Sequence, residues 1–447
     1  MQQEIRHPRP RLWVRVRDRR AHNRLQLAVE GLEERSLLSS GLYLPNPAIG
    51  ALPPSTHQSH VSVHHLAHHV APRHRVRPAV AHPFRERFVR SAYQQINLVS
   101  DFPVGVEGVN AKVQDPHLLN PWGMVINPHG PFWVSDQVTG LSTVYSVGPT
   151  PTNPSNVVTT DSLAVTIPPA ISQPSLPTPG FLPLTGPTGI VFNNTNSTSD
   201  FMLSDGSPAL FIFSTLDGQL AAWNGGLFGK PAEIVVPHSV VPTEEFTGLT
   251  LGSSGGQNYL YTADPRFPNG IDVFNNKFQM VTNLSPNQFV DPRLPAGFSP
   301  YNVQALTVHG VQQIYVAYIT PASGGGYIGV FNTDGTFVRQ FGNPSRGPLQ
   351  EPWGMVIAPS DFGRFSNDLL VGNFGDGHIS AFNPVTGRYM GQLTTARDQP
   401  IVIPFLWALN FGNGNGNGGG AANTLYFTAG IAGQYHGLLG AIQTARL

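Results

Sequence analysis

The sequence predicts an all-β protein, a six-bladed β-propeller preceded by a disordered N-terminal leader. The hexapeptide Pro-Trp-Gly-Met-Val-Ile occurs at 121–126 and again, letter for letter, at 352–357, and internal repeats are the first sign of a repeat architecture. Gly (48 residues) and Pro (42) are abundant, whereas charged residues make up only 12%. That composition is typical of many short strands joined by tight turns.

Six segments follow one plan, and their first strands are expected to start at residues 121, 187, 246, 303, 352 and 406. Each first strand has a small third residue, as at Gly123 and Gly354, which suits a crowded centre where backbones approach closely. An aromatic or branched second strand, a third strand and usually a fourth strand follow. Short antiparallel strands repeating at roughly 50–65 residues indicate a propeller.

The sixth copy lacks a fourth strand, and residues 93–101 form a strand-like stretch ahead of the first copy. We expect this stretch to complete the last sheet and close the ring, which removes the open sheet edge. Two insertions interrupt the plan. Residues 148–186 include an expected fourth strand at 163–168, and residues 410–423, rich in Gly and Asn, are expected to form a mobile hairpin tip that does not pack.

The predicted organisation is a basic leader (1–40), a disordered linker rich in Pro, His and Arg (41–92) and the propeller (93–447). Residues 1–90 hold 15 Arg against 6 Asp and Glu, a balance of +9, so the remainder carries −9. An acidic body argues against a nucleic-acid partner. No apolar run is long enough to span a membrane. The absence of cysteine excludes disulfides, thiolate catalysis and Cys-ligated metals.

Residues 27–39 read Leu-Ala-Val-Glu-Gly-Leu-Glu-Glu-Arg-Ser-Leu-Leu-Ser. They resemble the LEPR-XLL motif found near the N-termini of many exported planctomycete proteins, except that Glu34 stands where that motif often carries Pro. The resemblance implies an export or sorting signal, and thus a place in the cell envelope or outside the cell. The alternative is a short amphipathic helix without a special role.

Eight of the 16 histidines lie between residues 57 and 82. His64 and His68 are four residues apart, as are His65 and His69, so each pair would share a helix face, where it could hold a divalent metal ion. Prolines interrupt any long helix, and no carboxylates are interleaved, so a disordered linker is the simpler expectation.

The body resembles an uncharacterised family of bacterial exported six-bladed propellers, related in shape to NHL-repeat and gluconolactonase-like proteins. The motifs at 120–124, 371–379 and 427–431 carry this resemblance, which implies a fold and no activity. Gluconolactonases hold one divalent metal in the channel through Glu, Asn and Asp. The corresponding inner-strand positions here are expected to be Trp122, Thr188, Thr247, Gln304, Trp353 and Trp407. None of them is a carboxylate or Asn.

Two sets of residues are candidates for a binding site at the channel mouth. Asp136, Asp264 and Asn373 follow second strands and precede Gly-containing turns. They are expected to accept hydrogen bonds from turn N–H groups, or else to bind a cation or polar ligand, with Asp136 and Asp264 as weak metal candidates.

The second set consists of Trp122, Trp353 and Trp407, at equivalent strand starts. Their rings could line the mouth and stack on a sugar or aromatic ligand, or pack between blades. No nucleophile elbow, phosphate loop or helical zinc motif is present.

The sequence therefore favours an exported, monomeric, non-enzymatic binding or scaffold propeller with an unknown ligand or envelope partner. No catalytic residue and no cofactor is assigned, although a divalent cation remains possible. The alternative is a metal-dependent hydrolase, similar to a lactonase, that uses the central channel.

Overall fold

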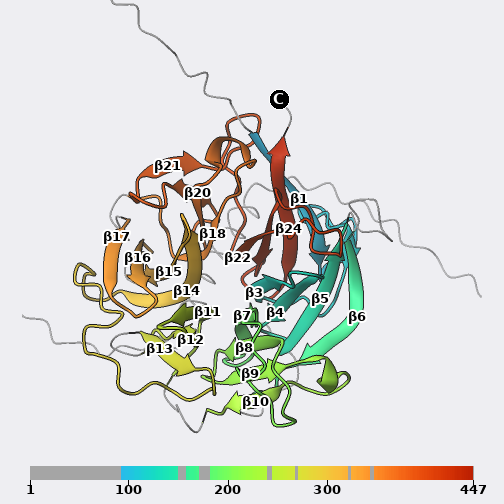
Figure 1. Ribbon diagram of the computed structural model, residues 1–447. Helices are drawn as coiled ribbons and strands as arrows, with labels where there is room; N and C mark the ends of the chain where they lie inside the picture. The colour runs from blue at the N-terminus through green and yellow to red at the C-terminus, as the bar shows by residue number, and fades with distance from the viewer. Residues whose placement is uncertain are drawn as a thin grey trace, which may run out of the picture.

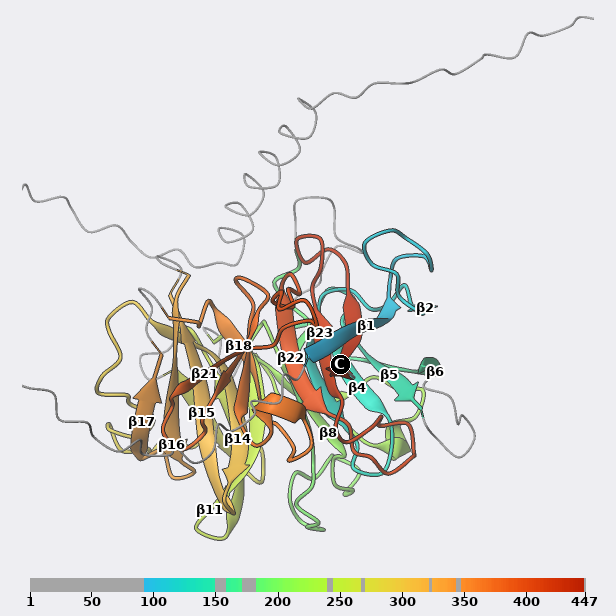
Figure 2. The same ribbon diagram turned by 90° about the horizontal axis from the view of Figure 1, so that it is seen from above.

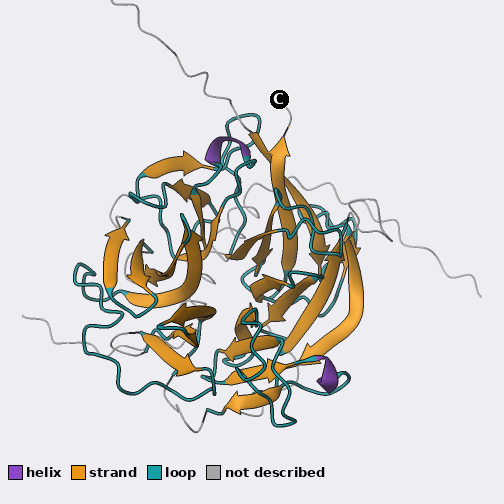
Figure 3. Ribbon diagram, in the orientation of Figure 1, coloured by secondary structure: helices purple, strands orange, loops and turns teal. Residues whose placement is uncertain are grey.

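The computed structural model describes residues 92–148, 158–170, 182–238, 244–266, 270–320, 324–342 and 347–445. These residues form an all-β six-bladed propeller (Figure 1). They contain no α-helix, only two short 3₁₀ turns, η1 (Gly225–Leu227) and η2 (Gly363–Phe365), drawn in purple in Figure 3. No helix in this part of the chain is long and apolar enough to cross a membrane.

Two predictions made for the N-terminal part of the chain fall outside the described residues. One is the export signal at the LEPR-XLL-like segment, residues 27–39. The other is the weak metal site formed by four histidines, namely His64, His65, His68 and His69. The structure therefore does not place these histidines, and both assignments stay predictions.

Each blade is one sheet that is built outward from the centre, and its strands are antiparallel except for the short β2 at the edge of blade 6, which pairs in parallel with β1. Blade 1 contains β3 (Pro121–Ile126), β4 (Phe132–Asp136), β5 (Leu141–Val147) and β6 (Val158–Thr166). Blade 2 contains β7 (Pro187–Phe192), β8 (Phe211–Thr215), β9 (Leu220–Trp223) and β10 (Glu233–Val236). Blade 3 has three strands in the described chain, β11 (Gly248–Ser254), β12 (Gln257–Ala263) and β13 (Ile271–Asn275).

The other three blades follow the same order. Blade 4 contains β14 (Ser299–Val308), β15 (Val311–Ile319), β16 (Gly326–Asn332) and β17 (Phe337–Phe341). Blade 5 contains β18 (Pro352–Ile357), β19 (Leu369–Asn373), β20 (Ile379–Phe382) and β21 (Tyr389–Gln392). Blade 6 contains β22 (Leu406–Phe411), β23 (Leu425–Ala429), β24 (Leu438–Ala445) and β1 (Ala92–Ser100), with the short β2 (Val113–Gln114) at its edge.

The core lies between neighbouring blades, because each sheet packs both of its faces against another sheet. The second strands β4, β8, β19 and β23 are buried at every residue. Burial on both faces explains why their sequences are short continuous apolar runs rather than alternating ones. Between blades 1 and 2, for example, Trp133 stacks on Phe211 at 3.9 Å between ring centroids.

The two ends of the described chain meet in blade 6. Strand β1 pairs antiparallel with β24, from Ala92 opposite Ala445 to Ser100 opposite Leu438, and Figures 1 and 2 show the two strands side by side. Asp101, directly after β1, accepts hydrogen bonds from the Gly437 backbone N–H at 2.8 Å and lies 2.5 Å from His436 Nδ1. The first strand therefore closes the ring. The boundaries at 1–40, 41–92 and 93–447 stay predictions.

The prediction that residues 410–423 do not pack is wrong. Val147 in blade 1 donates its N–H to Gly418 O at 2.7 Å and accepts from the Gly420 N–H at 3.2 Å. The Asn413 amide donates to two carbonyls of the β3–β4 turn, at Asn127 and Gly130. Alternating Asn and Gly allow this because the glycines take left-handed φ and the backbone itself makes the contacts. This segment joins blade 6 to blade 1.

Two strand predictions also need correction. Strand β6 begins at Val158 instead of residue 163. In blade 4, β14 begins at Ser299, and Asn302, not Ala305, takes the place of the small residue in the other inner strands. A Cβ on Gly248 would lie 2.1 Å from the Asn302 side chain, and the Asn302 amide donates to Trp353 O at 2.8 Å. Tyr301 therefore occupies the position that the sequence assigned to Gln304.

Candidate functional site

Four aromatic side chains meet where the inner strands begin, and we call them the aromatic centre: Trp122, Tyr301, Trp353 and Trp407. Trp122 stacks on Trp407 at 3.8 Å, and Trp353 meets Trp407 edge-on at 5.6 Å. Tyr301 lies 6.2 Å from Trp122 and 5.9 Å from Trp407. These residues come from blades 1, 4, 5 and 6, and blades 1 and 4 face each other across the ring. The contact between Trp122 of blade 1 and Tyr301 of blade 4 places the aromatic centre on the axis of the ring.

The three tryptophans are core residues, with exposed fractions of 0% to 5%. The Trp353 indole N–H donates to Thr247 O at 3.1 Å and the Trp407 indole to Asn120 Oδ1 at 3.0 Å. The buried Trp122 N–H finds no acceptor among the described residues. The half-buried residues beside them are Tyr301 and Phe405. The indoles thus fill this end of the ring, and Tyr301 and Phe405 are the residues beside them that keep some solvent exposure.

The residue that precedes the inner strand has a left-handed backbone in four blades. These residues are Asn120 (φ 46°), Gly186 (φ 98°), Glu351 (φ 48°) and Phe405 (φ 55°). Gly and Asn adopt this region readily, whereas Glu and Phe are strained in it. Strained backbone of this kind concentrates at functional sites. Glu351 and Phe405 are therefore unusual at the position that precedes an inner strand.

Glu351 is 9% exposed, and no hydrogen bond or ion pair to its carboxyl is found within the described chain. Burial, with a further contribution from the Asp376 charge, raises the pKa of Glu351 to about 7. Burial, with further contributions from the Glu351 and Glu245 charges, raises the pKa of Tyr301 well above its usual range.

The other carboxyls nearby have basic neighbours. Glu245 forms an ion pair with Arg266. Asp376 Oδ2 lies 3.0 Å from His378 Nδ1, although without hydrogen-bond geometry. We call Glu245, Glu351 and Asp376 the acidic rim. Of its three members, Glu351 alone has no basic partner among the described residues.

The amides near the rim are occupied. Asn120 donates to Gln137 Oε1 at 2.9 Å, and Gln137 donates to the backbone carbonyls of Pro183 and Thr185 at 2.7 and 2.6 Å. Together with the bond from Trp407 to Asn120, these contacts tie blade 6, blade 1 and the start of blade 2 together. The amides therefore hold the blades in place and have little capacity left for a ligand.

The three polar residues expected at the channel mouth lie in blades 1, 3 and 5. Asn373 is buried and donates to Pro348 O and Asp376 Oδ1, both at 2.9 Å. Asp264 is fully buried and accepts from the Arg266 turn N–H at 2.8 Å. Burial raises its pKa to about 7. Each side chain is bound within its own blade and its adjoining loops, so the geometry does not bring the three together.

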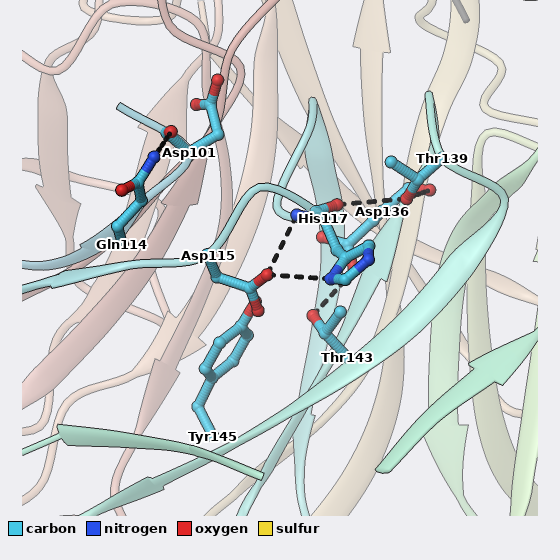
Figure 4. A network of polar contacts seen from close by, with 8 residues as sticks. All are labelled: Asp101, Gln114, Asp115, His117, Asp136, Thr139, Thr143 and Tyr145. Carbon is cyan, nitrogen blue, oxygen red and sulfur yellow. Dashed lines mark hydrogen bonds and ion pairs between the residues drawn. The ribbon is translucent and has the colours of Figure 1, made fainter. Parts of the chain in front are cut away.

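Asp136 lies in a buried polar network of blade 1, drawn in Figure 4. It accepts from the Thr143 hydroxyl at 2.7 Å instead of from a turn N–H, and its other oxygen has no partner in the described chain. Burial raises the pKa of Asp136 well above its usual range. The neighbouring Asp115 accepts from the Tyr145 hydroxyl at 2.9 Å and from the His117 N–H. This network anchors the chain that leads into β3.

The described residues offer no group of three or more His, Asp or Glu side chains placed to hold a metal ion. Asp136 and Asp264, the weak metal candidates, are in different blades. A shallow cavity of about 300 Å³ lies elsewhere, beside the loop that follows β22, and is lined by Asp361, Asn423 and the backbone of 414–422. It lies beyond the end of β22 opposite to Trp407.

Sequence reasoning missed Glu351 and Tyr301, although signals for both were present. The two hexapeptide copies are identical, but Asn120 precedes the first and Glu351 the second. Pro300-Tyr301 likewise parallels Pro121-Trp122. A small third residue was expected in each inner strand. Asn302 is not small, so the inner strand of blade 4 was expected to start at residue 303.

The fold and the site define this chain as a six-bladed β-propeller with an aromatic centre. It is 30% identical over 349 residues to uncharacterized protein R648 of Acanthamoeba polyphaga mimivirus, covering 73% of this chain and 76% of that protein. It is 29% identical over 344 residues to uncharacterized protein L690 of the same virus, covering 73% and 81%. The chain belongs to the family of these proteins. These relatives are viral, so they give no support to a bacterial family.

No family model matches the chain. Solved structures of similar shape include a streptogramin B lyase (TM-score 0.43, 13% identity, 80% of this chain and 100% of that one). The soluble aldose sugar dehydrogenase of Escherichia coli has a TM-score of 0.44 and 13% identity over 79% of this chain and 100% of that one. Likeness at this level says nothing about activity.

Proposed function

We propose that this protein is an exported, non-enzymatic binding propeller whose ligand lies over the aromatic centre, beside Tyr301, Glu351 and Phe405. The observation that carries the proposal is the filling of the ring axis by aromatic side chains from four blades. Stacked indoles make a rigid apolar floor, and half-buried aromatic rings at its edge offer contact area at little entropic cost.

Glu351 supports a binding role over packing alone. A left-handed Glu costs roughly 1–3 kcal/mol relative to an unstrained residue, and a buried carboxyl without a partner adds to that cost. Packing of the indoles requires neither feature. A ligand that contacts the carboxyl would offset both.

The competing proposal is a hydrolase that uses the same end of the ring. A carboxyl with a pKa of about 7 suits general acid–base catalysis near neutral pH. Such chemistry normally needs a second group, and on this rim Glu245 and Asp376 each already have a basic neighbour. Binding without turnover is therefore the better-supported function.

The test is a screen of the full chain against glycans, metabolites and organic cations by thermal shift, with mass spectrometry of each hit for turnover. Tyr301→Ala should abolish the shift that a hit produces in the parent protein. Tyr259→Ala is a matched control, because Tyr259 is half-buried near the opposite end of blade 3. Equal shifts in both variants would contradict the proposed site, and conversion of the ligand would favour the enzyme.

Export rests on the LEPR-XLL-like segment alone. Deletion of residues 25–40 should abolish secretion, and unchanged secretion would contradict this part of the proposal.

A further inference from the structure

We infer that the ligand carries an alkylated ammonium group, held between the Glu351 carboxyl and the aromatic rings of Tyr301 and Phe405. The inference rests on the proposed function, since it names the ligand class for the same site. Three independent features of the described residues lead to it: the charge of the rim, the arrangement of its rings and the occupation of its amides.

The charge of the rim is negative. Glu245, Glu351 and Asp376 face one full cation, the exposed Arg266, together with the imidazole of His378. Arg266 and His378 each already lie against a carboxyl, so Glu351 is the member of the acidic rim without a basic neighbour among the described residues. An anionic ligand would be repelled by this arrangement, whereas a cation would complete it.

The rings near Glu351 are in contact with one another through the buried Phe374. Phe374 lies 6.3 Å from Tyr301, 5.3 Å from Phe405 and 4.4 Å from Trp407. Its backbone N–H donates to Glu351 O at 2.9 Å, and a Cβ on the next residue, Gly375, would lie 3.3 Å from Glu351 Oε2. The Glu351 carboxyl therefore lies beside the segment that carries Phe374. Aromatic faces carry partial negative charge and attract ammonium groups, most strongly where the site is poorly hydrated.

The amides argue against a sugar. A neutral sugar on an aromatic floor would need free hydrogen-bonding groups around the ring. The side-chain amides of Asn120 and Gln137 form hydrogen bonds with each other, with the Trp407 indole and with backbone carbonyls. Glu351 is the carboxyl of the acidic rim left without a basic partner among the described residues, and a carboxylate near aromatic rings matches an alkylammonium ion.

The ionisation of Glu351 leads to a second measurable effect, a dependence of ligand binding on pH. An ammonium ion favours the carboxylate over the acid. Binding should therefore strengthen as the pH rises from 6 to 8 and should release a proton near pH 7. The other titratable groups that face this region are Glu245, Tyr301, Asp376 and His378. Among the carboxyls of this group, Glu351 is the one for which the described residues provide neither an ion-pair partner nor a hydrogen-bond partner.

The test compares two probes of the same shape, choline and 3,3-dimethylbutan-1-ol, by titration calorimetry of the full chain at pH 8. The two differ only in the charged nitrogen. Choline should bind at least about tenfold more tightly. Glu351→Gln should remove that difference, whereas Glu107→Gln, in an exposed loop, should retain it. If Glu351→Gln fails to fold, Glu351→Asn, which copies Asn120 of the first repeat, replaces it.

The possible failures can be told apart. Equal affinity for the two probes, or no binding of choline, would overturn the inference. The proposed function would still stand if another hit from the screen depended on Tyr301. Choline binding that survives both Glu351→Gln and Tyr301→Ala would place the cation elsewhere and overturn the inference as well.

Discussion

A pair of buried carboxyls in blade 3 makes stability depend on pH. Asp272 lies opposite Thr262 in the register of β12 and β13, on the same side of the sheet as Asp264. Both are at least 96% buried, and each has one oxygen without a partner among the described residues. Burial, with the Asp264 and Glu244 charges, raises the pKa of Asp272 from 3.8 to about 8.

The sign and the magnitude follow from linkage. The folded protein binds these protons more tightly than the unfolded chain, so the stability they confer is full below pH 4. It is lost as the pH rises towards 7 for Asp264 and 8 for Asp272. For Asp272, about four pH units at about 1.4 kcal/mol each give an upper magnitude of roughly 6 kcal/mol. Asp272→Asn should therefore unfold at higher urea concentration than the parent protein at pH 9, and at a similar concentration at pH 4.

Urea unfolding followed by circular dichroism at pH 4, 7 and 9 measures this. Asp161→Asn is the control, because Asp161 is exposed on β6, and it should follow the parent protein at every pH. If Asp272→Asn loses stability with rising pH as steeply as the parent protein, the buried acid pair is not responsible.

Three further predictions concern the ring and its rim. Glu351→Asn should raise the free energy of unfolding by about 1 kcal/mol at pH 8, because Asn tolerates a left-handed backbone; a loss measured by urea titration would argue against strain there. Gly186→Ala should lower Tm strongly, since its Cβ would lie 2.0 Å from Gln137 O, whereas Gly105→Ala, also left-handed but with nothing within 4 Å, should lower it little. Equal losses would rule out the close approach as the cause. Asp101→Ala should cost about 2 kcal/mol by leaving the Gly437 N–H and His436 unpaired; a urea midpoint like that of the parent protein would show that this contact does not secure the ring closure.

The fold was predictable because the repeat and the strand patterns report local backbone and burial requirements. The identical hexapeptides at β3 and β18, and the apolar runs of β4 and β19, follow directly from sheets that are covered on both faces. The strand-like stretch around Ile96 pairs with β24 because blade 6 lacks a fourth strand of its own. Each of these signals lies within a single strand or a single repeat.

The site was less predictable because it depends on contacts across the ring. The residues next to Glu351 in the sequence do not show that its carboxyl is buried without a partner. That depends on Arg266 and His378, which lie in blades 3 and 5 and pair with Glu245 and Asp376. The alignment of Tyr301 with Trp122 depends on where β14 begins. That start was missed because Asn302 stands where a small residue was expected. The Gly/Asn segment around Asn413 also looked unable to pack because its partners are backbone atoms of blade 1.

The most direct test of the account is a crystal structure of the full chain with the tightest ligand from the screen. We expect ligand density over the aromatic centre, in contact with Tyr301 and within hydrogen-bond distance of Glu351. Density in the cavity beside Asp361, with the aromatic centre unchanged, would contradict it.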